Sequence, residues 1–192
     1  MLLSNVVAVA AGWDGSLLLK SDGTVAGLGR GVPKGLTNIS AVAAATDYNG
    51  HNLALAKDGA VLEWDNCGND AACVAGLSNV VAVAAGPDFG LALKSNGTVA
   101  AWSAHPSAAT SVPAGLTNVI AIAAGGDSGP PSSTFALALK NDGTVTAWGQ
   151  MDLRHPATIP VGLSNVVAVA AGDGWGLAIT TNPAVADKFR KY

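Results

Sequence analysis

A tripeptide, Leu-Ser-Asn or Leu-Thr-Asn, recurs five times along the chain and divides it into copies of similar length. It stands at residues 3–5, 36–38, 77–79, 116–118 and 163–165. The copies repeat about every 40 residues, which is the length of one β-propeller blade. A unit of this size cannot bury a core alone and is stable only when stacked on its neighbours. We therefore expect a single domain over residues 1–192, with repeats 3–35, 36–76, 77–115, 116–162 and 163–192.

Each copy contains three short apolar segments in the same order. The first alternates valine and alanine, as in residues 80–85, and the second is rich in leucine, as in residues 91–94. Small side chains at every second position of a strand let neighbouring sheets approach closely. The third segment, such as residues 144–149, carries a tryptophan in three copies; we expect these tryptophans in the core, at Trp64, Trp102 and Trp148.

A turn signal joins the second and third segments in four copies. The pairs are Asp22-Gly23, Asp58-Gly59, Asn96-Gly97 and Asp142-Gly143. Such pairs tolerate positive φ angles and predict two-residue hairpins of type I′. The fifth copy lacks this pair, although residues 184–189 could supply a return strand.

Repeated antiparallel units of three or four strands bury both faces by packing radially. The sequence therefore predicts an all-β protein, a β-propeller of about five blades. Five units can close a small wheel, which we expect here. The alternative is a part of a larger wheel.

The succession of residues 118–125, 136–140 and 142–149 resembles the regulator of chromosome condensation repeat. It is closest in style to the form found in a secreted bacterial propeller that inhibits β-lactamases. The resemblance covers nearly the whole chain and implies a propeller, usually of seven blades, so the alternative becomes a fragment of a seven-bladed propeller. Because the family includes exchange factors and enzyme inhibitors, the resemblance implies a protein partner without specifying an activity.

Composition and motifs exclude several classes of function. Charged residues make up 12% of the chain, with 10 Lys+Arg against 13 Asp+Glu, so there is no basic field for nucleic acid. No apolar run reaches the roughly 18 residues of a membrane helix. No nucleophile or acid–base signature accompanies the histidines, so we expect no enzyme, no cofactor and no metal, and exposed loop positions for His51, His105 and His155.

The candidate site is a set of loops that follow the first segment of each copy. An aspartate stands there in all five copies, and an aromatic residue lies within two residues in four of them. If the copies are radially equivalent, these loops share one face, and carboxylates beside aromatic rings suit a protein hot spot or a sugar site. The predicted ligand-binding residues are Trp13, Asp14, Tyr48, Asp88, Phe89, Asp127 and Trp175. The alternative is that each aspartate only shapes its turn.

Two cysteines, Cys67 and Cys73, flank a glycine- and asparagine-containing stretch between the second and third copies. We expect a disulfide rather than two free thiols, which places the protein outside the cell or at its surface. No further ligands follow at zinc-finger spacing.

These observations predict a non-enzymatic binding module that recognises a protein partner through one loop-bearing face. A carbohydrate-binding lectin with one shallow site per blade is the first alternative. The second is a structural propeller segment of a larger surface protein. Periodic aromatic residues favour the lectin, whereas the unequal lengths of the loops count against it.

Overall fold

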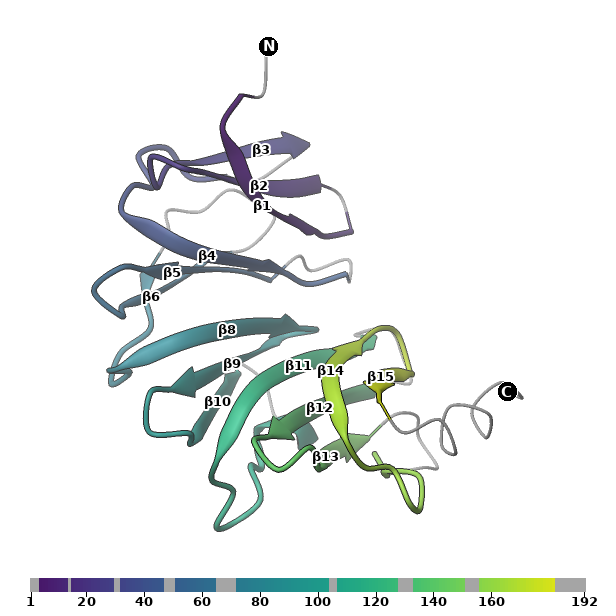
Figure 1. The fold of residues 1–192 in the computed structure, drawn as a ribbon. Helices are drawn as coiled ribbons and strands as arrows, with labels where there is room; N and C mark the ends of the chain where they lie inside the picture. The colour runs from purple at the N-terminus through teal and green to yellow at the C-terminus, as the bar shows by residue number, and fades with distance from the viewer. Residues whose placement is uncertain are drawn as a thin grey trace.

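The structure is a computed structural model of the chain, and it describes residues 4–13, 15–29, 32–46, 51–64, 72–103, 107–127, 133–150 and 156–181. The regular secondary structure of these residues consists of short β-strands and one 3-10 helix (Figure 1). Each repeat forms one antiparallel sheet, which we call blades 1 to 5 in chain order. The prediction of an all-β propeller architecture is confirmed.

Every blade begins with the Val/Ala strand, which pairs with the leucine strand, and in blades 1 to 4 the leucine strand then pairs with a return strand. Blade 1 contains β1 (Val6–Ala11), β2 (Gly15–Lys20) and β3 (Val25–Gly29); blade 2 contains β4 (Ile39–Ala44), β5 (Asn52–Ala56), β6 (Val61–Trp64) and β7 (Ala72–Cys73); blade 3 contains β8 (Val80–Gly86), β9 (Phe89–Lys94) and β10 (Val99–Ser103); blade 4 contains β11 (Val119–Asp127), β12 (Ser133–Lys140) and β13 (Val145–Gln150); and blade 5 contains β14 (Val166–Ala171) and β15 (Gly176–Thr180). A short 3-10 helix, η1 (Ala108–Thr110), lies between blades 3 and 4.

The hairpin turns between the second and third strands are not of type I′. In blade 3, Gly97 has a φ of 75°, whereas Asn96 is not among the residues with positive φ. The Gly97 N–H donates to the Lys94 carbonyl at 2.9 Å, and the Lys94 N–H donates to the Thr98 carbonyl at 2.9 Å. This is a type I turn followed by a glycine bulge. The asparagine is favoured as an acceptor, since its Oδ1 lies 3.1 Å from the Thr98 N and 2.7 Å from the Thr98 Oγ1.

The asparagine of the recurring tripeptide has the same backbone conformation in all five blades. All five copies of it are left-handed, with φ between 54° and 63°, a conformation that asparagine tolerates better than most residues. Gly97 of blade 3 approaches Asn118 of blade 4, and its carbonyl accepts the Val119 N–H at 3.0 Å. Equivalent bonds join Gly23 to Ile39 and Gly143 to Val166. The hairpin turn of one blade therefore contacts the tripeptide of the next blade, which explains why both features recur together in the sequence.

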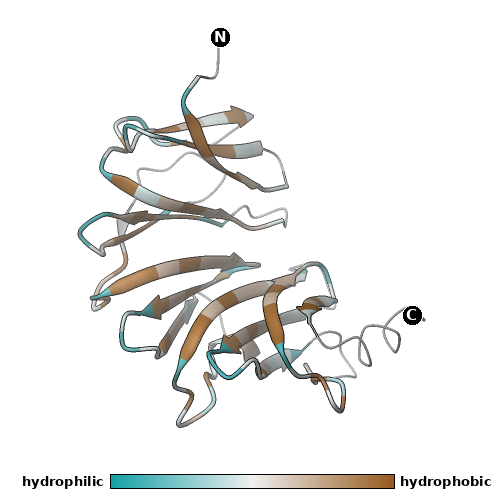
Figure 2. Cartoon of the chain, in the orientation of Figure 1, coloured by the Kyte–Doolittle hydropathy of each residue, from teal (hydrophilic) through white to brown (hydrophobic). Residues whose placement is uncertain are grey.

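Neighbouring blades pack a leucine face against an alanine face. Leu91 and Leu93 of blade 3 lie against Ala136 and Ala138 of blade 4. The same arrangement joins the other neighbouring blades, and Figure 2 shows the apolar stripes along the strands. The predicted core positions of Trp64 and Trp148 are confirmed, since both are buried; Trp102 is half-buried and packs against the core between blades 2 and 3.

The five blades form an open arc (Figure 1). Each first strand packs on the next one along the arc, whereas the described strands of blade 1 do not pack on β14 or β15. The leucine face of blade 5 stays exposed: Leu177 is 53% exposed, while its counterpart Leu137 in blade 4 is 4% exposed. The expected closed wheel is therefore wrong, because four steps of this leucine-on-alanine packing, one between each pair of neighbouring blades, leave the first and fifth blades apart. The arc is consistent with the alternative, a propeller fragment.

Candidate functional site

The loops that join the first and second strands lie at one end of the blades, and backbone contacts connect neighbouring loops. The Trp13 N–H of blade 1 donates to the Ala45 carbonyl of blade 2 at 3.3 Å. The Gly126 N–H of blade 4 donates to the Gly172 carbonyl of blade 5 at 2.9 Å. The loops of these blade pairs thus form continuous stretches of surface.

Two of the predicted aromatic residues are well exposed on these loops. Trp13 is 66% exposed and Trp175 is 57% exposed. The Trp175 ring lies against the backbone of Gly172, where a Cβ atom would come within 2.6 Å of it. Indole rings held against glycine backbone in this way present a flat apolar face to solvent.

Phe89 does not share this arrangement, because it is fully buried. Its ring covers Gly86 of its own hairpin and packs in the core between blades 3 and 4. Phe135 occupies the equivalent place in blade 4 and is also fully buried. Trp175 stands at this same position of blade 5, where no described blade covers it. Phe89 therefore serves the core, and its ring is not available to a ligand.

The described aspartates of the loops differ in their surroundings. Asp88 is half-buried and has a φ of 55° in the turn between β8 and β9, where its carbonyl accepts from the Ser103 hydroxyl. Asp127 is exposed, and its backbone N–H donates to the Ser133 Oγ at 3.1 Å. The backbone of both aspartates thus takes part in shaping the loops. Asp14, Asp47 and Tyr48 lie outside the described residues.

A partly buried polar cluster between blades 2 and 3 was not predicted from the sequence. The Nε2 atom of His51 lies 2.6 Å from the Oε1 atom of Glu63, and the Trp102 Nε1 donates to the Glu63 Oε2 at 2.8 Å. The His51 hydrogen bond, together with its charge and the Trp102 bond, lowers the pKa of Glu63 although partial burial acts in the opposite direction. His51 is only 8% exposed, so its expected exposed position is wrong, whereas His105 and His155 lie outside the described residues.

The sequence does contain signals for this cluster. Glu63 is the only glutamate in the chain, and β-sheet pairing places it where blades 1, 3 and 4 have Gly27, Ala101 and Ala147. His51 likewise stands where blades 3 and 4 have Phe89 and Phe135. A single glutamate and a single histidine at otherwise apolar positions of a repeat suggest that the two side chains pair.

This cluster links blades 2 and 3 through hydrogen bonds to one carboxylate, and we call it the Glu63 clamp. The Glu63 carboxylate holds a histidine of its own blade and an indole of the next blade, and both of its oxygens are used. The Nδ1 atom of His51 is buried without a hydrogen-bond partner among the described residues.

The described residues include no group of three or more potential metal ligands. They also include no helix long and apolar enough to cross a membrane.

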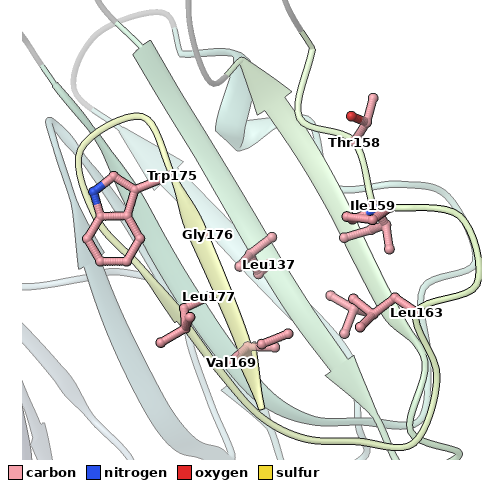
Figure 3. Close-up of a pocket in the computed structure, with 11 residues that line it drawn as sticks. Leu137, Thr158, Ile159, Leu163, Val169, Trp175, Gly176 and Leu177 are labelled. Carbon is pink, nitrogen blue, oxygen red and sulfur yellow. The ribbon is translucent and has the colours of Figure 1, made fainter. Parts of the chain in front are cut away.

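A pocket of about 310 Å³ lies between blades 4 and 5 (Figure 3). Its walls are mainly aliphatic, and its lining residues are Leu137, Val145, Thr158, Ile159, Pro160, Leu163, Val169, Trp175, Gly176, Leu177 and Ala178. The pocket follows β15 and is bordered by Trp175, so it adjoins the loop-bearing end of blade 5.

Neither a family model nor a curated protein matches the sequence. Several solved structures resemble the fold. Human WBSCR16 is 20% identical, with a TM-score of 0.70, and the match covers 95% of this chain and 60% of that one. Prp20p from Saccharomyces cerevisiae, studied for its binding to Gsp1p and histones, is 19% identical, with a TM-score of 0.73, covering 98% and 59% of the two chains.

A second structure of the yeast protein, named there as yeast RCC1 (Prp20) and bound to Kap60, is matched at 17% identity with a TM-score of 0.70. That match covers 98% of this chain and 57% of the other, so the chain spans less than two thirds of the length of these proteins. The predicted resemblance to the regulator of chromosome condensation repeat is confirmed at the level of the fold. The chain has the fold of an RCC1-like β-propeller.

Proposed function

We propose that this chain is a non-enzymatic binding module that recognises a protein partner through the loop-bearing end of its blades. The observation that carries the proposal is the exposure of Trp13 and Trp175 on those loops. Large aromatic side chains are enriched at the centres of protein interfaces, where they fill pockets of the partner at low cost in conformational entropy. Asp14, Tyr48, Asp88 and Asp127 would supply polar contacts around them.

Two further observations support a protein as the partner. Yeast Prp20p, which shares the fold, binds proteins, namely Gsp1p, histones and Kap60. The net charge of this chain is −3, which favours a partner with a neutral or basic surface over a polyphosphate.

The test compares the purified protein with two single variants, Trp13→Ala and Trp175→Ala. Val161→Ala serves as the control, because Val161 is 99% exposed and lies in the turn that leads into β14, at the opposite end of that strand from Trp175. Proteins captured from the native source are identified by mass spectrometry, and the affinity of each purified candidate is then measured by calorimetry. We expect a loss of at least about tenfold for one tryptophan variant and no change for the control.

Other outcomes decide against the proposal. A captured protein that binds all variants equally does not use the loops. Binding to a glycan array that disappears in the tryptophan variants indicates a lectin, and the absence of both protein and glycan ligands indicates a structural segment.

An extracellular or cell-surface location is part of the proposal. It rests on the predicted disulfide between Cys67 and Cys73; Cys67 lies outside the described residues, and Cys73 ends β7. Thiol labelling followed by intact mass measurement, with and without reductant, tests it. We expect two labelled thiols only after reduction, and labelling of the unreduced native protein would contradict the disulfide.

A further inference from the structure

The walls of the pocket between blades 4 and 5 are those of a tryptophan site. At the interface of blades 3 and 4, Trp148 lies in one core cluster with Leu91, Val99, Val112 and Leu116. The residues at the same four positions of the next interface line the pocket, and they are Leu137, Val145, Ile159 and Leu163.

The same four wall positions accompany a tryptophan at the two remaining interfaces. Trp64 lies in the core between blades 1 and 2, and Trp102 packs against the core between blades 2 and 3. The residues at the wall positions are Leu17, Val25, Val32 and Leu36 for Trp64, and Leu53, Val61, Val74 and Leu77 for Trp102. A tryptophan among aliphatic walls is therefore a regular feature of these interfaces.

The return strand supplies the tryptophan in each of these three cases. In blade 4, Trp148 pairs with Ala136, and Ala136 pairs with Ala124 on its other side. The corresponding residue of β15 is Gly176, because it pairs with Ala171 of β14. Gly176 lines the pocket, so the pocket lies where the tryptophan of blade 5 would stand.

The fifth copy of the repeat does not encode a tryptophan at this position. Thr180 is the counterpart of Lys140, since both pair with the first valine of their blade. The offset from Lys140 to Trp148, applied to Thr180, leads to Lys188, which lies outside the described residues. No tryptophan follows Trp175 in the sequence.

The chemistry of the lining suits a neutral aromatic ligand. The volume of about 310 Å³ is in the range of small-molecule sites. Thr158 and Trp175 contribute the polar side-chain atoms of the lining, and none of the lining residues is charged. Figure 3 shows the aliphatic side chains of Leu137 and Val169 between them. Apolar cavities that lack one large side chain take up small aromatic molecules of matching size.

We propose that the pocket binds a small, neutral aromatic molecule of the size of indole, which takes the place that tryptophan has at the other interfaces. The Trp148 Nε1 donates to the Ala109 carbonyl at 2.7 Å, and an N–H group of the ligand would donate to the Thr158 hydroxyl in the same way. This site goes beyond the proposed loop surface, because its ligand is a small molecule held between two blades.

The probe is 5-fluoroindole, and its binding to the full chain is followed by fluorine NMR, which the tryptophans of the protein do not obscure. We expect saturable binding with a Kd below about 1 mM. The flexible aliphatic compound 6-fluorohexan-1-ol should bind at least about threefold more weakly, because it loses more conformational freedom. Equal or tighter binding of the alcohol would overturn the assignment of an aromatic ligand.

On the protein, Ala178→Met should fill the pocket and reduce the affinity for 5-fluoroindole at least about tenfold, because the flexible thioether adapts to irregular apolar space. Ala114→Met is the matched control. Ala114 is exposed, and its counterpart in blade 5, Val161, is not among the residues that line the pocket. Circular dichroism confirms the fold of both variants. Equal affinities of a folded Ala178→Met protein and the wild type would overturn the proposed site.

Photolabelling with 5-azidoindole tests the site on the wild-type chain without relying on a variant. We expect label in the peptides that contain residues 158–163 and 175–178, and excess 5-fluoroindole should suppress it. No saturable binding at millimolar 5-fluoroindole overturns the proposal, whatever fills the pocket instead, and so does label confined to other blades. Because Trp13→Ala lies outside the pocket, failure here leaves the loop-surface proposal to its own test.

Discussion

Removal of the Glu63 carboxylate should loosen the contact between blades 2 and 3. Glu63→Ala removes the acceptor of the His51 bond at 2.6 Å and of the Trp102 bond at 2.8 Å. Hydrogen bonds to a charged group contribute about 1.5–3 kcal/mol each. Because the Glu63 side chain is 31% exposed, water can replace part of this, and we expect a combined loss of about 2 kcal/mol. For a chain of this length, that lowers the Tm by about 4–8 °C.

Glu63→Gln separates the charge from the geometry. The amide oxygen can still accept from Trp102, and the amide group can then donate to a neutral His51, so both contacts survive without the negative charge. We expect about half of the loss seen for alanine. Scanning calorimetry at pH 7 on the three proteins measures both changes.

The pH dependence of the Tm provides a second, independent test of the role of the Glu63 carboxylate. The folded protein holds the pKa of Glu63 below its ordinary value of 4.5, so the ionised carboxylate stabilises the folded state fully above that value. This stabilisation is lost as the pH falls through the lowered pKa. The difference in Tm between wild type and Glu63→Gln should therefore shrink as the pH falls below 4.5.

Subtracting the variant removes the contributions of other carboxyls. These include Asp22 and Asp142, whose pKa values are lowered by hydrogen bonds from Thr24 and Thr144. Equal Tm values for wild type and Glu63→Ala at pH 7 would refute the clamp. A difference that persists unchanged below the folded-state pKa would refute the role of the charge.

Two further predictions concern the packing of neighbouring blades. Gly97→Ala and Gly115→Ala start from similar φ angles of 75° and 77°, but a Cβ on Gly97 would lie 3.1 Å from the Asn118 N, whereas Gly115 has nothing within 4 Å. We expect the first variant to lose about 1 kcal/mol more than the second in urea unfolding, and equal losses would show that blade contact is unimportant there. Trp148→Phe removes the bond from the indole Nε1 to the Ala109 carbonyl at 2.7 Å and should cost about 1–3 kcal/mol in the same assay; an unchanged midpoint would contradict this.

The strands and their order were predictable because each is encoded locally and five times over. The Val/Ala segments became the first strands and the Leu-rich segments the second, as expected. The turn type was not predictable from the dipeptide alone. Asp-Gly and Asn-Gly fit both a type I′ turn and a type I turn with a glycine bulge. Thr98, two residues after Asn96, favours the second by donating to the Asn96 side chain.

Closure of the wheel depends on a quantity that the repeat pattern does not contain. The rotation between blades follows from how deeply leucine side chains such as Leu91 and Leu93 settle against the alanine face of the next blade. A small difference in the rotation between neighbouring blades adds up along the five blades and decides whether the first and the last blade meet. Repeat number therefore predicted the architecture correctly and the closure incorrectly.

The environment of a repeated residue depends on whether a neighbouring blade covers it. Phe89, Phe135 and Trp175 stand at one position of the repeat, and the first two are fully buried because blades 4 and 5 cover them. Trp175 is exposed at the end of the arc, as are Leu177 and Ile179 beside it. The same pattern thus builds the core inside the arc and an apolar surface at its end. For this reason periodicity alone could not separate Phe89 from Trp175 as candidate ligand residues.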